Sequence, residues 1–199
     1  MPGILLQFAH PALEKSRANR VLLDAVRALP GVTVNDLYEQ YPDFDIDVDR
    51  EQALLLAHEH VVFQHPFYWY STPPLVKQWE DLVLEHGWAY GRAGTALAGK
   101  TWLHALTTGG RAEAYQPTGA NRFTLRQLLA PFEQTAFLCR MRYLPPFAVT
   151  GTHRLDDDAL AAAADQYRQV LTALNAGTLD GAAAPYADTL NALFTEAQP

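Results

Sequence analysis

Residues 61–91 read VVFQHPFYWYSTPPLVKQWEDLVLEHGWAYG, which is an apolar strand, an aromatic loop and an amphipathic helix in succession. The strand ends at His65 and Pro66, and Pro73 and Pro74 open the helix. Four aromatic residues, 67–70, begin the loop between them. Ligands of open α/β sheets bind where strands end, and aromatic rings suit a flat, polarizable ligand. The loop is therefore a candidate ligand site; the alternative is that its rings fill the core or a subunit interface.

Length and composition favour one domain. A chain of 199 residues can form one full core with a short appendage. None of its apolar blocks approaches the ~20 residues of a membrane-spanning helix. The amino terminus, MPGILLQFAH, has no basic region before its short apolar run. We therefore expect a first strand there rather than a signal peptide, and a cytoplasmic location. Cys139 is the one cysteine, which excludes an internal disulfide and predicts a buried core thiol.

The charge balance limits the partners. The formal net charge is −7 and the pI is near 5.4. Nucleic acids and anionic membrane surfaces require a basic face, so neither is expected as the primary partner. Isolated basic side chains can still bind a phosphate group.

Strand and helix patterns alternate along the chain. We expect strands at 4–9, 32–37, 61–64 and 101–106, a fifth at either 140–143 or 147–149, and helices at 16–29, 51–57, 74–86, 125–138 and 156–174. This alternation predicts a parallel sheet with helices on both faces, and five strands indicate the flavodoxin-like, doubly wound α/β fold. We assign that domain to 1–175 and a C-terminal extension to 176–199, with a short helix at 186–194.

Three loops at the predicted carboxyl edge carry groups that suit a phosphorylated planar ligand. The first runs from His10 into the helix start at Ser16, where free N–H groups, the helix dipole and Arg17 favour a phosphate. The second is the aromatic loop. The third contains paired glycines, Gly109 and Gly110, which let backbone N–H groups approach a ligand. Taken singly, Ser16 can be an ordinary helix cap and the glycines an ordinary turn.

Three other patterns suggest chemistry that their context does not support. GTALAGKT at 94–101 fits the P-loop pattern, but it leads into a strand instead of a helix. Asp43, Asp45, Asp47 and Asp49 alternate like a calcium loop but lack its glycine and its terminal glutamate, so we expect a solvated acidic loop. His58 and His60 flank Glu59, but a metal site needs further ligands and a pocket that a sequence does not show, so we expect surface residues and no metal site. We expect His65 and His86 to be structural.

Several of these motifs resemble one known family. HPxxxxSxxN after the first strand, HPFYWYSTPPLVKQWED, GWAYG, ALTTGG and YLPPF are similar to segments of the flavodoxin-like NAD(P)H:quinone oxidoreductases. Within them, the resemblance is closest to the bacterial ancillary proteins of glutathione-regulated potassium-efflux systems. It covers nearly all of residues 4–175. It implies a homodimer that binds one non-covalent flavin per subunit, FMN or FAD, at a site completed across the interface, with NAD(P)H as co-substrate.

The resemblance also assigns residues to the flavin. By position, the cofactor-binding residues are His10, Ser16, Arg17, Ala18, Asn19, Pro66, Phe67, Tyr68, Trp69, Thr107, Thr108, Gly109 and Gly110. Tyr115 matches the active-site tyrosine of quinone reductases. Asn121 stands where the broader family has a histidine, which departs from a mechanism that uses a Tyr/His pair.

Two classes of function follow from the resemblance. The first is a flavoenzyme that transfers two electrons as hydride from NAD(P)H through flavin to a quinone or a similar acceptor. The second is a regulatory subunit on the cytoplasmic face of a potassium-efflux transporter, peripheral to the membrane, with flavin as a structural or sensing element. The two are compatible. An electron-carrying flavodoxin is a weaker alternative, because its phosphate loop is shorter and rich in hydroxyl groups.

Overall fold

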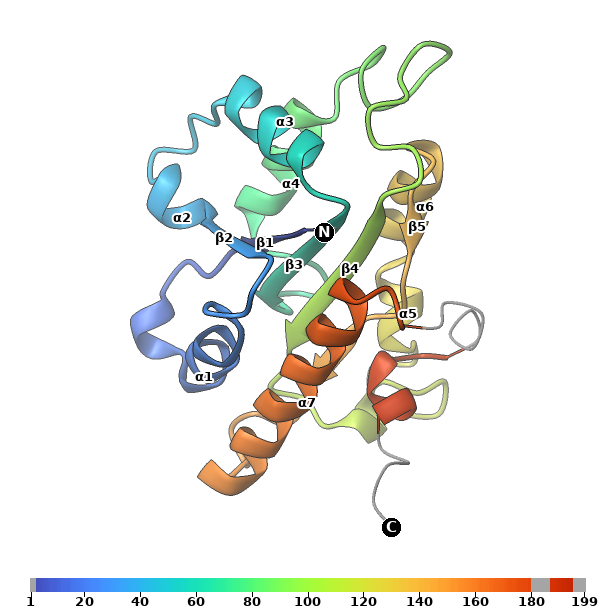
Figure 1. Cartoon of the computed structure of the whole chain (residues 1–199). Helices are drawn as coiled ribbons and strands as arrows, with labels where there is room; N and C mark the ends of the chain where they lie inside the picture. The colour runs from blue at the N-terminus through green and yellow to red at the C-terminus, as the bar shows by residue number, and fades with distance from the viewer. Residues whose placement is uncertain (1–2, 180–186, 195–199) are drawn as a thin grey trace.

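The computed structural model describes residues 3–179 and 187–194 (Figure 1). Its sheet contains β1 (Ile4–Phe8), β2 (Val32–Asp36), β3 (His60–Pro66), β4 (Thr101–Thr107), β5 (Arg142–Tyr143) and β6 (Phe147–Val149). The α-helices are α1 (Arg17–Val26), α2 (Leu37–Gln40), α3 (Val48–Ala57), α4 (Pro74–Val83), α5 (Leu125–Leu128), α6 (Ala130–Leu138) and α7 (Asp157–Asn175). The strand order is β2-β1-β3-β4-β5, and all pairs are parallel. The predicted fold class is thus confirmed.

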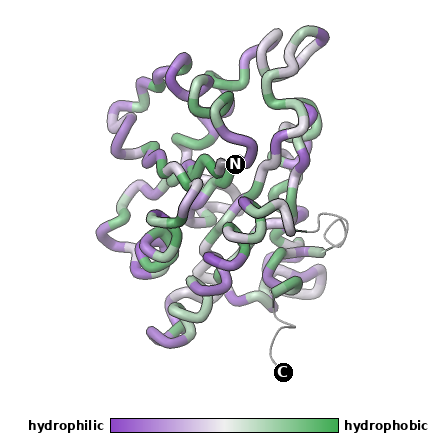
Figure 2. The backbone as a smooth tube through the Cα atoms, viewed as in Figure 1, coloured by the Kyte–Doolittle hydropathy of each residue, from purple (hydrophilic) through white to green (hydrophobic). Residues whose placement is uncertain are grey.

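The alternating side chains of each strand divide the core into two layers. In β1, Ile4, Leu6 and Phe8 pack with α1 and α7, whereas Leu5 lies in the cluster that α2 to α6 complete. Both faces of the central strands are buried, as a parallel sheet between helical layers requires. In Figure 2 the hydrophobic colour gathers on the central strands and the hydrophilic colour on the outer turns. No helix in the described residues is long and apolar enough to cross a membrane.

The fifth strand position is occupied by both candidate segments. β5 pairs with the start of β4, and β6 pairs with its end. Between them lie Pro145 and Pro146, which have no N–H to donate and so interrupt the ladder. The expectation of one segment or the other was wrong.

The single helix expected at 125–138 is also wrong, because α5 and α6 are separated at Leu129. Pro131 explains the break, since a proline inside a continuous helix removes one hydrogen bond and clashes with the preceding turn. Thr124 caps α5 in a capping box with Gln127. The single cysteine follows α6 and is buried, as predicted.

His58 and His60 are less exposed than the surface residues that the sequence predicted. His60 is buried because β3 begins at residue 60, where it pairs with both Ile4 and Thr101. His58 is half-buried, and its ring nitrogens lie 2.7 Å from the Leu54 carbonyl and 2.8 Å from Thr33 Oγ1. His65 is fully buried and His86 is exposed.

The segments that resemble a P-loop and a calcium loop do not have the geometry of those sites. Residues 94–101 run directly into β4 with no helix after them, which is not P-loop geometry. Asp47 caps α3 by accepting the Arg50 N–H at 2.9 Å. Among the described residues, no three His, Cys, Asp or Glu side chains gather as a metal site.

The C-terminal extension is described in part. A 3₁₀ turn, η3 (Leu190–Phe194), packs on α7 and β6, and Leu190 is fully buried. The short helix expected at 186–194 is therefore present at 190–194, and Tyr186 lies outside the described residues.

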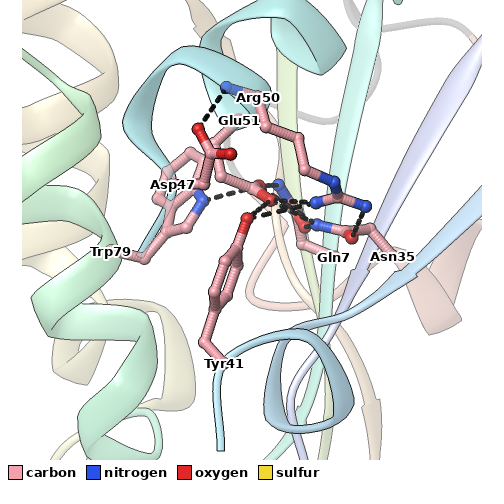
Figure 3. Close-up of polar contacts among 7 residues, drawn as sticks. All are labelled: Gln7, Asn35, Tyr41, Asp47, Arg50, Glu51 and Trp79. Atoms are coloured by element: carbon pink, nitrogen blue, oxygen red, sulfur yellow. Dashed lines mark hydrogen bonds and ion pairs between the residues drawn. The ribbon is translucent and has the colours of Figure 1, made fainter. Parts of the chain in front are cut away.

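A buried carboxylate links β1, β2, α2, α3 and α4 (Figure 3). Glu51 is fully buried and accepts hydrogen bonds from Gln7, Asn35, Tyr41, Arg50 and Trp79 at 2.6–3.0 Å. The Arg50 guanidinium also donates to the side-chain amide oxygen of Asn35, Oδ1, at 3.0 Å. A buried charge is costly unless it is fully bonded, and here five donors satisfy it. The network fixes α3 and α4 against the sheet beneath the aromatic loop.

A second buried carboxyl, Glu80 on α4, has no hydrogen-bond donor within the described residues. Burial raises the pKa of Glu80 to about 7, more than Lys77 lowers it. The unfolded carboxyl titrates near 4.5. Below pH 4.5 both states hold the proton, and above it only the folded state does. The stability gained from that proton is therefore lost as the pH rises to 7.

Glu80→Gln cannot lose a proton, so we expect its stability relative to wild type to improve by about 3 kcal/mol between pH 4.5 and 8. Urea denaturation at the two pH values measures this change. Exposed Glu113→Gln is the control and should show less than about 0.5 kcal/mol of change. A pH-independent difference for Glu80→Gln would show that folding does not raise the pKa of this carboxyl.

Candidate functional site

A cavity of about 500 Å³ lies at the carboxyl edge of the sheet. Three of its walls come from the loops predicted by sequence, those after β1, β3 and β4, and the fourth comes from the loop after β6. The predicted residues that line it are His10, Ser16, Arg17, Ala18, Asn19, Pro66, Phe67, Tyr68, Thr107 and Gly109. Ala12, Lys15, Thr152 and His153 line it as well. This cavity is the candidate functional site.

The start of α1 offers unused donors to the cavity. Ser16 caps the helix, as predicted, by accepting the Asn19 N–H at 3.2 Å. Within the described residues, the N–H groups of Arg17 and Ala18 make no hydrogen bond, so they remain available at the positive end of the helix dipole. The Arg17 guanidinium forms an exposed ion pair with Asp157 at 3.2 Å. Lys15 has no ion pair among the described residues and leaves a positive charge at the cavity wall.

His10 lies in the same loop, and its imidazole ring is neutral. Its Nδ1 accepts the Ala12 N–H at 3.1 Å, which places the ring proton of the neutral form on Nε2. Burial lowers the pKa of His10, although Glu14 acts in the opposite direction. The ring therefore offers the cavity one N–H donor and no charge at neutral pH.

Asn19 joins three walls of the cavity. Its Nδ2 donates to Thr107 Oγ1 at 2.8 Å, and its backbone carbonyl accepts from Gln64 Nε2 at 3.0 Å. The side chain is almost completely buried, yet Oδ1 has no hydrogen-bond partner within the described residues. An unpaired buried acceptor at a cavity wall is costly and indicates that a ligand or water completes it.

The aromatic loop divides into a buried part and an exposed part. The Phe67 N–H donates to the Thr107 carbonyl at 2.8 Å, so Pro66 and Phe67 stay against β4 and line the cavity. Beyond them the chain turns sharply, and Ser71 donates to the Tyr68 carbonyl at 3.0 Å. Trp69 lies outside the cavity with 92% of its surface exposed.

The turn in this loop is strained. Trp69 and Tyr70 have positive φ angles of 49° and 65°, where bulky residues are rare. Each such residue costs on the order of 1 kcal/mol and usually persists only where a site requires its geometry. The turn projects aromatic rings from the rim of the cavity into solvent.

The loop after β4 approaches the cavity with its backbone. Thr108 is held by its N–H to the Val149 carbonyl at 2.9 Å and by its hydroxyl, which donates to the Gly110 carbonyl at 2.6 Å. The N–H groups of Gly109 and Gly110 make no hydrogen bond within the described residues. A Cβ at Gly109 would lie 3.0 Å from the His153 ring, and one at Gly110 would lie 3.2 Å from Tyr115. A side chain at either position would therefore have to displace His153 or Tyr115 by a few tenths of an ångström.

Tyr115 and Asn121 lie beside this cavity and do not line it. Tyr115 lines a second cavity of about 320 Å³, and its ring packs edge-on against Phe67 at 6.1 Å. Burial raises the pKa of the Tyr115 hydroxyl, while its bond with Thr108 lowers it. Asn121 accepts a long hydrogen bond, 3.4 Å, from the Tyr70 hydroxyl. Thr108 and Gly110 likewise do not line it: Thr108 is buried, and Gly110 lines an adjoining cavity that Gly109 shares.

Sequence reasoning missed Thr152 and His153. They follow β6, so they reach the same edge as the other loops. The signal was available, since every parallel strand delivers its following loop to this edge, but the expectation was limited to strands one, three and four. The uncertainty over the fifth strand obscured which loop followed it.

The sheet order and the position of the cavity define a flavodoxin-like α/β protein. The chain belongs to the flavodoxin-like fold family, whose model matches residues 3–171. The ancillary protein KefG of the glutathione-regulated potassium-efflux system of Pectobacterium carotovorum subsp. carotovorum (strain PC1) is 51% identical over 170 residues, which are 85% of this chain and 93% of that protein.

Two solved structures are also similar. General stress protein 14 of Treponema denticola, in complex with FMN, matches with a TM-score of 0.83 and 40% identity over 87% of this chain and 99% of that one. An NADPH-quinone reductase of P. pentosaceus matches with a TM-score of 0.77 and 34% identity over 84% of this chain and 96% of that one.

Proposed function

We propose that this protein is a flavin-dependent NAD(P)H:quinone oxidoreductase. The observation that carries the proposal is the cavity at the carboxyl edge, in which unused N–H donors at the start of α1 and at Gly109 lie on either side of the apolar wall from Pro66 to Tyr68. Its relatives include a protein named as an NADPH-quinone reductase and a protein solved with FMN. A cavity of about 500 Å³ has the size of a typical cofactor site.

The residues fit the two ends of a flavin. The free N–H groups of Arg17 and Ala18, the helix dipole and the Lys15 ammonium would bind the phosphate. The Asn19 amide oxygen, which lacks a partner, would accept a hydrogen bond from the ribityl hydroxyls. Pro66 and Phe67 would contact the ring, and the N–H group of Gly109 would face its pyrimidine side, with Gly110 next to it in the adjoining cavity. FMN needs only this one phosphate site, whereas FAD would extend beyond it.

When bound, the flavin supplies two-electron hydride chemistry between NAD(P)H and the acceptor. The protein's part is to hold the ring, to exclude water from one face and to present fixed donors where negative charge develops. The N–H group of Gly109 serves that last purpose, because Gly109 already lines the cavity and its N–H makes no hydrogen bond within the described residues. Tyr115 lies directly behind Gly110 and keeps its proton, so its hydroxyl can steady the same charge. Asn121 is uncharged and holds the neighbouring Tyr70 hydroxyl.

The exposed rings favour a homodimer as the working form. Tyr68, Trp69 and Tyr70 are 42%, 92% and 49% exposed on the strained turn beside the cavity. A second copy covering this turn would offset the strain and complete the open side of the site. Light scattering should give twice the chain mass for wild type, and Trp69→Ser should increase the monomer fraction at low concentration. A wild-type monomer would contradict the dimer.

The half-reactions test the function directly. The protein is reconstituted with FMN or FAD, and its visible spectrum is recorded under anaerobic conditions with NADPH and then with a quinone. We expect bleaching by NADPH and recovery on quinone addition. A protein that retains neither flavin would contradict the cofactor assignment.

The same experiment separates a second candidate function, which the similarity to KefG favours. In that role the protein is a regulatory subunit of a potassium-efflux transporter, located at the cytoplasmic face of the membrane. A protein that binds flavin but is not reduced by NADPH or NADH would favour regulation over turnover. Bleaching followed by recovery establishes the enzyme and is compatible with both roles.

Gly109→Val tests the placement of the ring. A β-branched side chain would occupy the cavity and press on His153, so we expect FMN affinity to fall about tenfold or more, which corresponds to roughly 1.4 kcal/mol. Flavin fluorescence titration measures the affinity. Ala53→Val, exposed on α3, is the matched control and should bind as wild type does. Unchanged affinity in Gly109→Val would remove this loop from the site.

A further inference from the structure

Two histidines of neighbouring strands face each other inside the sheet. His65 of β3 and His104 of β4 are both fully buried, and His65 Nε2 lies 2.9 Å from His104 Nδ1. The Trp102 indole N–H donates to His104 Nε2 at 3.1 Å. At the other end, His65 Nδ1 lies 3.0 Å from the Pro66 carbonyl oxygen. Four groups thus form a continuous chain that ends at the wall of the cavity.

The direction of every hydrogen bond follows by elimination. An indole N–H can only donate, so His104 Nε2 carries no proton and His104 Nδ1 carries one. A carbonyl oxygen can only accept, so His65 Nδ1 carries a proton and His65 Nε2 is the acceptor. His104 therefore donates to His65, and all three bonds point toward Pro66.

This arrangement requires both rings to be neutral. One more proton on either ring would set two N–H groups face to face. The surroundings agree, since the ring centroids of Phe63, Phe132 and Tyr143 lie 5.7, 4.7 and 5.9 Å from that of His104. Burial lowers the pKa of His65 to about 4, and burial and then the nearby His65 lower the pKa of His104.

The chain acts on one peptide unit. The Pro66 carbonyl is bonded to His65, and the N–H of the same peptide, from Phe67, is bonded to the Thr107 carbonyl at 2.8 Å. With both polar groups engaged, the peptide plane between Pro66 and Phe67 cannot rotate without breaking a buried hydrogen bond. Pro66 and Phe67 line the cavity, and the strained turn at Trp69 begins two residues later.

We propose that Trp102, His104 and His65 form a positioning chain that fixes the Pro66 to Phe67 peptide as one wall of the flavin site. The inference rests on the proposed function. His65 and His104 do not line the cavity and act only through the backbone. The wall is thereby set by the sheet rather than by the exposed end of the loop, and it is in place before a ligand arrives. Such preorganisation favours binding because no ordering cost remains.

Two substitutions at one position separate positioning from plain stability. In His65→Asn the amide N–H₂ occupies the place of Nδ1 and can still donate to Pro66, while the link to His104 is lost. In His65→Gln the longer amide reaches the place of Nε2 and can keep the link to His104, while the bond to Pro66 is lost. Each variant breaks one buried hydrogen bond, so the two should lose similar stability in urea.

FMN affinity should differ between them. We expect His65→Asn to bind FMN within about threefold of wild type and His65→Gln to bind about tenfold more weakly, since one buried hydrogen bond corresponds to roughly that factor. Flavin fluorescence titration gives both values. Equal losses in the two variants would overturn the proposal and leave the histidines a purely structural role.

A measurement on the flavin-free wild-type protein covers the case in which the variants do not fold. Nitrogen-15 NMR of labelled histidines should show the Nδ1–H tautomer for both His65 and His104 at pH 7, unchanged at pH 5.5. An Nε2–H tautomer or an imidazolium on either ring would overturn the chain. If the wild-type protein binds no flavin, the proposed function fails and the flavin wall fails with it, whereas wrong tautomers in a flavin-binding protein refute the chain alone.

Discussion

The hydrogen bond from Asn19 to Thr107, 2.8 Å long, is the interaction on which the site depends. Asn19 belongs to the first turn of α1, Thr107 ends β4, and Gln64 of β3 bonds to the Asn19 carbonyl. One buried residue thus fixes the distance between the free N–H groups of α1 and the two other loops. Since Phe67 bonds to the same Thr107 residue, a change at this point would shift two walls of the cavity at once.

On the face of the sheet opposite α1, buried polar groups hold the strands and helices from which the cavity loops extend. The Glu51 carboxylate is bonded by donors from several elements, and the neutral histidine pair links β3 to β4. These solutions differ in kind. The Glu51 oxygens accept from five donors that replace water, whereas the histidines stay neutral because their bonds leave no place for another proton. Both networks use directional hydrogen bonds to fix the relative positions of strands and helices, which apolar packing alone would leave adjustable.

Much of the fold was predictable from the sequence, because apolar strand runs alternate with amphipathic helices and parallel strands bring their following loops to one edge. The same rule placed Ser16, Pro66 and Gly109 at one cavity. The broken helix at Leu129 and the divided fifth strand were missed, although Pro131, Pro145 and Pro146 were visible, because a proline marks an interruption without saying what the chain does on either side of it.

The buried polar residues were beyond pattern reasoning. Glu51 has the spacing of a helix-surface residue, and its partners come from residues as far away in sequence as Gln7. His104 lies in the buried strand β4, and its contact with His65 depends on the register between β3 and β4. Trp69 shows a different limit of pattern reasoning, since an aromatic run predicts contact with a ligand but does not reveal the positive φ turn that carries this ring out of the cavity of its own chain.

A crystal structure of the protein grown with FMN tests the central claim most directly. The account predicts phosphate oxygens within hydrogen-bond distance of the Arg17 and Ala18 N–H groups, and a ring between Pro66, Phe67 and the Gly109 backbone. The Pro66 to Phe67 peptide should keep the orientation that it has here. A phosphate bound elsewhere, or a ring outside these loops, would contradict the account.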